Sequence, residues 1–149
     1  MILRLRVRLA RRDQGRAIVE FLVVGLLLLV PVVYFVVTLS RVQAAAFAVS
    51  TASREAGRAF TTAVDEDGAY ARAQAAARIS FEDFDFGADG RVDLRCDGAP
   101  CLRPEGRVEV VATVNVRLPL VPDLLSGAIP TLLPVSATHV ATVDRFRGR

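Results

Sequence analysis

The chain has 149 residues, of which 52% are hydrophobic, and its formal net charge is +3. Five of the 19 basic residues, all of them arginines, lie within the first 15 residues beside a single acid, so the rest of the chain is close to neutral. The sequence has no basic patch with interleaved aromatic residues, which argues against nucleic acid as a partner. The length leaves room for one modest domain beside a membrane segment.

The basic leader, residues 1–15, is followed by a run of 19 residues without a charge, from Phe21 to Leu39. A helix of that length spans roughly 28 Å, close to the thickness of the hydrocarbon core of a bilayer. We therefore expect a transmembrane helix over residues 16–40, kinked at Pro31 because apolar sequence continues on both sides of it. The arginines of the leader predict an N-terminus in the cytoplasm and a C-terminal part outside. A cleavable signal peptide is the alternative, because small residues follow at positions 44–48.

The next segment, residues 41–64, contains no proline and a single glycine, Gly57. Small apolar side chains recur there at steps of three and four residues, which predicts that the long helix continues with one apolar face. Phe60 is expected at the edge of that face and Ser53 away from it. Either the chain's own outer domain or neighbouring subunits would cover the face. Its predicted members are Val42, Ala45, Val49, Ala52, Ala56, Ala59 and Ala63.

The remaining residues, 65–149, predict a small extracytoplasmic domain with one short helix and about three strands. Asp67 is the expected N-cap of a helix over residues 69–79. Alternation of apolar and polar residues predicts strands over residues 92–96, 108–118 and 135–146. The expected fold class is α+β, in which the long N-terminal helix packs against a small antiparallel sheet.

The segment between the last two predicted strands, residues 119–134, is rich in leucine and contains four prolines. So apolar a loop is unusual on a protein surface. Two interpretations stay open: a lid over the core, or a contact for a partner or for the membrane surface.

The two cysteines, Cys96 and Cys101, are separated by four residues that include Asp-Gly and Pro, so the chain can turn back between them. Outside the cytoplasm this spacing favours a disulfide. The single histidine, His139, lies in a predicted strand, and the sequence contains no catalytic or phosphate-binding motif. Two cysteines and one distant histidine are too few ligands for a zinc site. We therefore expect a protein that is not an enzyme and that has no cofactor and no metal.

The most informative motif is the junction between the leader and the apolar run, DQGRAIVEF at residues 13–21. Gly15 follows the basic leader, and Glu20 lies five residues later, at the start of the apolar helix. This arrangement resembles the processing site of type IV prepilins and, within that class, the TadE-like proteins of the tight-adherence (Flp) pilus assembly system. A carboxylate at the edge of an apolar segment is costly and needs a partner, which marks Glu20 as a functional candidate.

The resemblance implies that a prepilin peptidase cuts between Gly15 and Arg16 on the cytoplasmic side of the membrane. Glu20, with Phe21 beside it, would then meet the new amine of a neighbouring subunit and set the register of an assembling bundle. Because major Flp pilins are much shorter, the resemblance implies a minor pilin, or pseudopilin. Such a protein would lie in the bacterial cytoplasmic membrane, with other pilin or pseudopilin subunits and the pilus assembly machinery as partners.

Two alternatives to this interpretation stay open. In the first, Glu20 pairs only with Arg16, one helical turn earlier, and has no further role. In the second, the chain is a secreted or membrane-anchored binding module whose apolar run is a signal sequence or a simple anchor.

Overall fold

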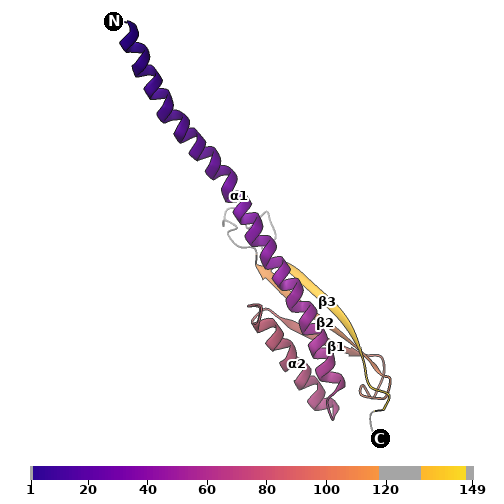
Figure 1. The fold of residues 1–149 in the computed structure, drawn as a ribbon. Coiled ribbons are helices and arrows are strands. Elements are labelled where there is room, and N and C mark those ends of the chain that lie inside the picture. The colour runs from indigo at the N-terminus through magenta and orange to yellow at the C-terminus, as the bar shows by residue number, and fades with distance from the viewer. Residues whose placement is uncertain (1, 118–131, 147–149) are drawn as a thin grey trace. The chain divides into compact units, whose positions relative to one another are not determined.

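A computed structural model describes the backbone of residues 2–117 and 132–146, and the side chains from residue 17 onward within these ranges. Two helices are followed by three strands (Figure 1). The coarse prediction is confirmed: the fold is α+β, with a long N-terminal helix and a small antiparallel sheet. The elements are α1 (Ile2–Thr61), α2 (Glu66–Glu82), β1 (Arg91–Cys96), β2 (Arg107–Arg117) and β3 (Leu132–Thr142).

The chain divides into two compact units between Thr38 and Leu39, and α1 contributes to both. In the N-terminal unit, the described side chains of α1 are almost all exposed, although most of them are apolar. Among the described residues, α1 from Ala17 onward is the one helix that is long and apolar enough to cross a membrane. A helix suits that environment because it satisfies its own backbone hydrogen bonds without water. α1 continues through Pro31; the kink expected there stays a prediction.

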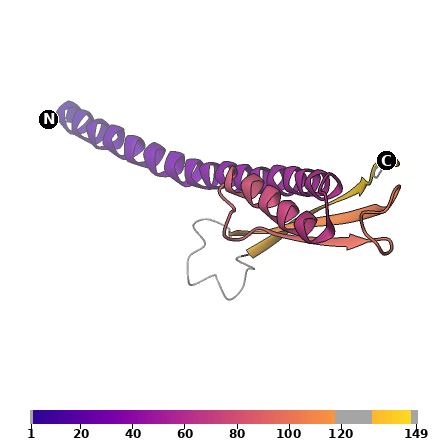
Figure 2. The same cartoon turned by 90° about the horizontal axis from the view of Figure 1, so that it is seen from below.

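The second unit, which we call the C-terminal domain, is built on the sheet. Its strands pair antiparallel in chain order, so β2 lies between β1 and β3. The C-terminal part of α1 and the whole of α2 lie on the same side of the sheet (Figure 2). Alternate residues of β2 are buried beneath them, as the alternating sequence predicts. These residues are Val108, Val110, Ala112, Val114 and Val116.

The small apolar face predicted for residues 41–64 forms much of the core of this domain. The chain's own outer domain therefore covers this face. Ala45, Ala52 and Ala56 are fully buried in one cluster with the valines of β2. Two details of the prediction are wrong: Phe60 is fully buried instead of lying at the edge, and Ser53 is only 2% exposed. Burial of Ser53 is tolerated because its hydroxyl donates to the carbonyl of Ser50 at 3.1 Å, so the polar atom keeps a partner.

Gly57 lies where α1 packs closely against β3. A Cβ atom at this position would lie 3.0 Å from the Cβ of Ala141 and 3.3 Å from the Cδ2 of His139, both on β3. The glycine therefore sets the spacing between α1 and β3, which offsets its low helix propensity. Its neighbour His139 is half-buried beside the helix.

The second helix begins earlier than predicted. The N-cap of α2 is Asp65 and not Asp67: Asp65 has an extended backbone, and its carboxylate accepts a hydrogen bond from the N–H of Gly68. Asp67 instead lies in the first turn, where its charge favours the helix dipole. α2 also extends to Glu82, because Phe81 is buried and holds the last turn on the core.

The last strand is shifted toward the N-terminus relative to the prediction. β3 includes Pro134, which the prediction placed in the segment before the strand, and it ends at Thr142, before the predicted end at Phe146. Pro134 is tolerated because β3 is an edge strand, where one side of the backbone has no ladder partner. Residues 118–131 lie outside the described residues. They include most of the leucine-rich segment and also Leu118, the last predicted residue of the second strand. The expected lid or contact role of that segment is therefore still a prediction.

Candidate functional site

The predicted processing site lies within α1, since Gly15 and Arg16 both fall inside its bounds. Their side chains lie outside the described residues. Glycine in a helix interior is less stable than alanine by about 1 kcal/mol. Gly15 is therefore a weak point in the helix propensity of this part of α1.

Glu20 lies in the first described turns of α1, immediately before Phe21 and the uncharged run. Both side chains are exposed. Among the side chains that the structure describes, no arginine lies within ion-pair distance of Glu20. In a bilayer a carboxylate at the edge of the hydrocarbon region is costly unless it has a partner, and the nearest basic side chain in the sequence, that of Arg16, lies outside the described residues.

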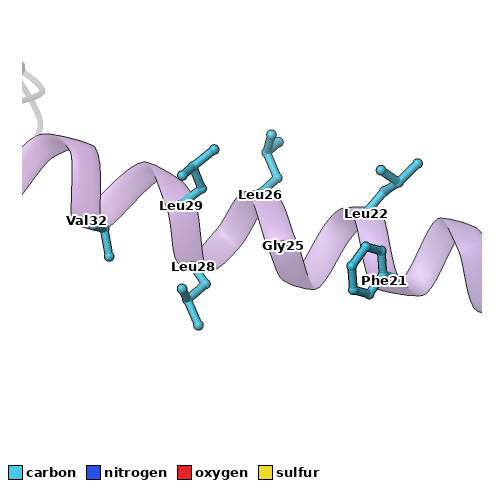
Figure 3. A pocket seen from close by; sticks show the side chains of 7 residues that line it. All are labelled: Phe21, Leu22, Gly25, Leu26, Leu28, Leu29 and Val32. Atoms are coloured by element: carbon cyan, nitrogen blue, oxygen red, sulfur yellow. The ribbon is translucent and has the colours of Figure 1, made fainter.

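A shallow apolar groove lies one turn further along α1. Gly25 forms its floor, and a Cβ atom there would meet nothing within 4 Å. The side chains of Leu22, Leu26 and Leu29 stand on one side of Gly25. Those of Phe21, Leu28 and Val32 stand on the other (Figure 3). The groove has a volume of about 400 Å³ and is lined by Phe21, Leu22, Gly25, Leu26, Leu28, Leu29 and Val32. A small residue between large ones lets a second helix approach closely, the usual geometry of helix contacts in membranes.

The predicted cysteine pair forms a disulfide, with 5.4 Å between the Cα atoms of Cys96 and Cys101. The bond closes the first turn of the β1–β2 connection. The hydroxyl of Tyr70 on α2 lies 3.9 Å from Sγ of Cys96 and 3.8 Å from Sγ of Cys101. At the same end of α2, the carboxylate of Glu66 accepts a hydrogen bond from the N–H of Leu102 at 3.3 Å. The disulfide loop is thus joined to the N-terminal end of α2, a contact that sequence spacing alone does not reveal.

The same connection is closed by Asp97. Its carboxylate accepts a hydrogen bond from the N–H of Arg107 at 3.0 Å and forms an ion pair with Arg103 at 2.9 Å. The hydrogen bond from the N–H of Arg107 is the main cause that holds the pKa of Asp97 below its ordinary value. Desolvation of the carboxylate opposes it, and the positive charge of Arg103 has a smaller effect that lowers the pKa further. Asp97 therefore stays ionised and keeps the hairpin closed.

Among residues 17–117 and 132–146, no three His, Cys, Asp or Glu side chains come together in a way that would hold a metal ion. The predicted site residues fall into two separate groups: residues 15–31 on α1, and the cysteine pair at the β1–β2 connection. Comparisons with protein-family models, with curated proteins and with solved structures find no match to this chain.

Proposed function

We propose that this chain is a non-enzymatic minor pilin, or pseudopilin, of a tight-adherence (Flp) type pilus system. A prepilin peptidase removes residues 1–15, and the mature chain takes part in pilus assembly from the cytoplasmic membrane. The observation that carries the proposal is the position of Glu20. The chain places a carboxylate five residues after Gly15, at the start of an uncharged helix.

The chemistry of that position explains why cleavage and assembly would be coupled. Cutting after Gly15 creates an amine on Arg16, which would supply a cation for the carboxylate of Glu20. A carboxylate and an ammonium in a low-dielectric setting attract strongly, and removal of either partner leaves a costly unpaired charge. If the amine belongs to a neighbouring subunit, the ion pair fixes the register of the two helices.

Two features of the structure support an assembly role. The groove at Gly25 offers a place for a second helix at the same end of the apolar run. The apolar face of α1 in the C-terminal domain is buried in that domain's own core, so this face needs no other subunit to cover it. A small self-contained domain on such a helix suits a subunit that primes or caps an assembly.

The test is the N-terminus of the mature chain. We expect intact mass and N-terminal sequencing of the membrane fraction to give a chain that starts at Arg16, in cells that contain a prepilin peptidase. Cells without the peptidase should retain the leader, and so should a Gly15→Leu variant, because a side chain at that position obstructs the protease. Gly25→Leu is the matched control, since it changes a glycine of the same helix beyond the junction and should be cut normally.

A secreted or membrane-anchored binding module is the second candidate, favoured by the small residues at positions 44–48. It predicts a mature chain that starts within that segment and is found in the soluble fraction. The structure argues against such a cut, because Ala45 and Ala48 are fully buried in the domain core and their removal would open it. An intact leader in both kinds of cell would leave an anchored module and overturn the pilin proposal.

A further inference from the structure

One end of the C-terminal domain is defined by two ion pairs that meet on the connection between α2 and β1. Arg41, at the start of the domain on α1, binds Asp85 at 3.2 Å. Arg117, at the end of β2, lies 4.0 Å from Asp89. Since Arg117 pairs with Leu132 in the sheet, the first residues of β3 belong to the same end. We call this end the α1-entry end.

The α1-entry end exposes apolar side chains at the beginning of β3. Leu132 is 50% exposed and Leu133 is 42% exposed. Consecutive residues of a strand point to opposite faces, so the two leucines place apolar surface on both sides of the sheet at this end. Neither leucine belongs to the buried core of the domain.

The charges at this end are compatible with a lipid surface. The carboxylates of Asp85 and Asp89 each face an arginine, which reduces their repulsion from lipid phosphates. The guanidinium of Arg41 also lies over the ring of Phe86, 5.6 Å from its centroid. Phe86 itself is buried in the core, so the membrane-compatible side chains here are the arginines, whose long apolar stems suit a membrane interface.

The chain itself identifies what these leucines meet. Leu39, the first residue of the domain, is bonded directly to Thr38, the last residue of the N-terminal unit with its apolar run. Arg41 follows Leu39 by two residues, so the end of the domain that holds Arg41 is the end nearest in sequence to the apolar run. We propose that the α1-entry end rests on the lipid surface from which α1 emerges, with Leu132 and Leu133 inserted among the lipid headgroups and upper acyl chains. This inference rests on the membrane anchoring that is part of the proposed function.

The chain contains no tryptophan, so a single introduced tryptophan reports its own surroundings. The full chain, reconstituted in vesicles, would carry Leu132→Trp, and the quencher would be lipid brominated high on its acyl chains. The matched control is Val140→Trp, on the same strand and the same face of the sheet, with Val140 53% exposed. It lies eight residues further along β3, roughly 27 Å away. Phe35→Trp, within the apolar run, reports anchoring itself.

We expect Leu132→Trp to emit at shorter wavelength than Val140→Trp and to lose emission in brominated vesicles, whereas Val140→Trp keeps its emission. Leu133→Trp provides a second reporter if the first variant fails to fold. Quenching of Phe35→Trp without quenching of either leucine variant would overturn the lipid contact and leave the anchor intact. Equal quenching of Val140→Trp would also overturn it, because the domain would then lie on its side. If Phe35→Trp itself escapes quenching, the anchoring premise fails and the inference fails with it.

Discussion

The ring of Tyr70 meets the ring of Phe60 edge to face, with 5.0 Å between the centroids and 82° between the planes. Phe60 is fully buried near the end of α1, while Tyr70 lies on the first turns of α2 with its hydroxyl beside the disulfide. One side chain thus contacts both the core of the C-terminal domain and the Cys96–Cys101 loop. The stability of that loop and the docking of α2 should therefore be coupled.

The disulfide should stabilise the domain modestly. Replacing both Cys96 and Cys101 by serine should lower the free energy of unfolding by about 2 kcal/mol, because the bond closes a short loop in the unfolded chain. The measurement is urea unfolding of the detergent-solubilised full chain, followed by near-ultraviolet circular dichroism. An unchanged unfolding midpoint would show that the loop is held by its other contacts, above all Asp97.

Tyr70 should matter through its ring more than through its hydroxyl. Tyr70→Ala removes the edge-to-face contact with Phe60 and partly buried apolar area, so we expect a loss of about 1–3 kcal/mol in the free energy of unfolding. Tyr70→Phe keeps the ring and should stay within about 0.5 kcal/mol of the original chain. Equal losses in the two variants would assign the stabilisation to the hydroxyl beside the disulfide instead.

Gly57 should resist enlargement. In Gly57→Val the new side chain would press on Ala141 and His139, which lie 3.0 Å and 3.3 Å from the position of the first added carbon. Overpacking of this kind costs about 1–3 kcal/mol, more than valine gains in helix propensity over glycine. The matched control is Arg54→Val on the exposed side of the same helix, which adds valine without a clash. Thermal unfolding of both variants compares the two positions, and equal melting temperatures would contradict close contact at Gly57.

Acid should weaken the β1–β2 connection. The pKa of Asp97 is lowered below its ordinary value of 3.8 in the folded chain, chiefly by the hydrogen bond from Arg107. Folding therefore favours the ionised form of Asp97. Its contribution to the stability of the fold is fully present when the pH is above the ordinary pKa. That contribution is lost as the pH falls through the lowered pKa. Asp97→Asn should remove this part of the pH dependence. The measurement is the unfolding midpoint of the original chain and of Asp97→Asn as the pH is lowered from neutral into the acid range. Parallel curves of midpoint against pH would refute the assignment.

The sequence predicts elements well where one physical signal dominates. Strict alternation of apolar and polar residues identifies β2. Small residues that recur every three or four positions identify the buried face of α1. The errors arise where tertiary context decides. Ser53 is polar but satisfies its hydroxyl within its own helix, and the last strand begins at Leu132, before Pro134, because Pro134 lies on an edge strand of the described sheet.

The candidate site divides in the same way. Cys96 and Cys101 are close in sequence, so their disulfide could be predicted from spacing. The ion pair of Arg41 with Asp85 joins residues 44 positions apart, and the contact of Tyr70 with Cys101 joins residues 31 positions apart. No local pattern encodes such pairs, because they depend on how α1, α2 and the sheet pack together.

Glu20 gives the sharpest test of the assembly role. Glu20→Gln keeps the size and hydrogen-bonding capacity of the side chain but removes its charge, so the cut after Gly15 should proceed as before while subunit association fails. Loss of one partner from a desolvated ion pair costs about 3–5 kcal/mol, enough to weaken association on the order of a hundredfold or more. Crosslinking of mature subunits in the membrane measures association, and N-terminal sequencing of the same sample checks the cut. Glu20→Asp is the matched control: it keeps the charge on a shorter side chain and should retain part of the association. Normal crosslinking of Glu20→Gln would mean that Glu20 has no cationic partner in a neighbouring subunit, and its role would reduce to a local contact with Arg16.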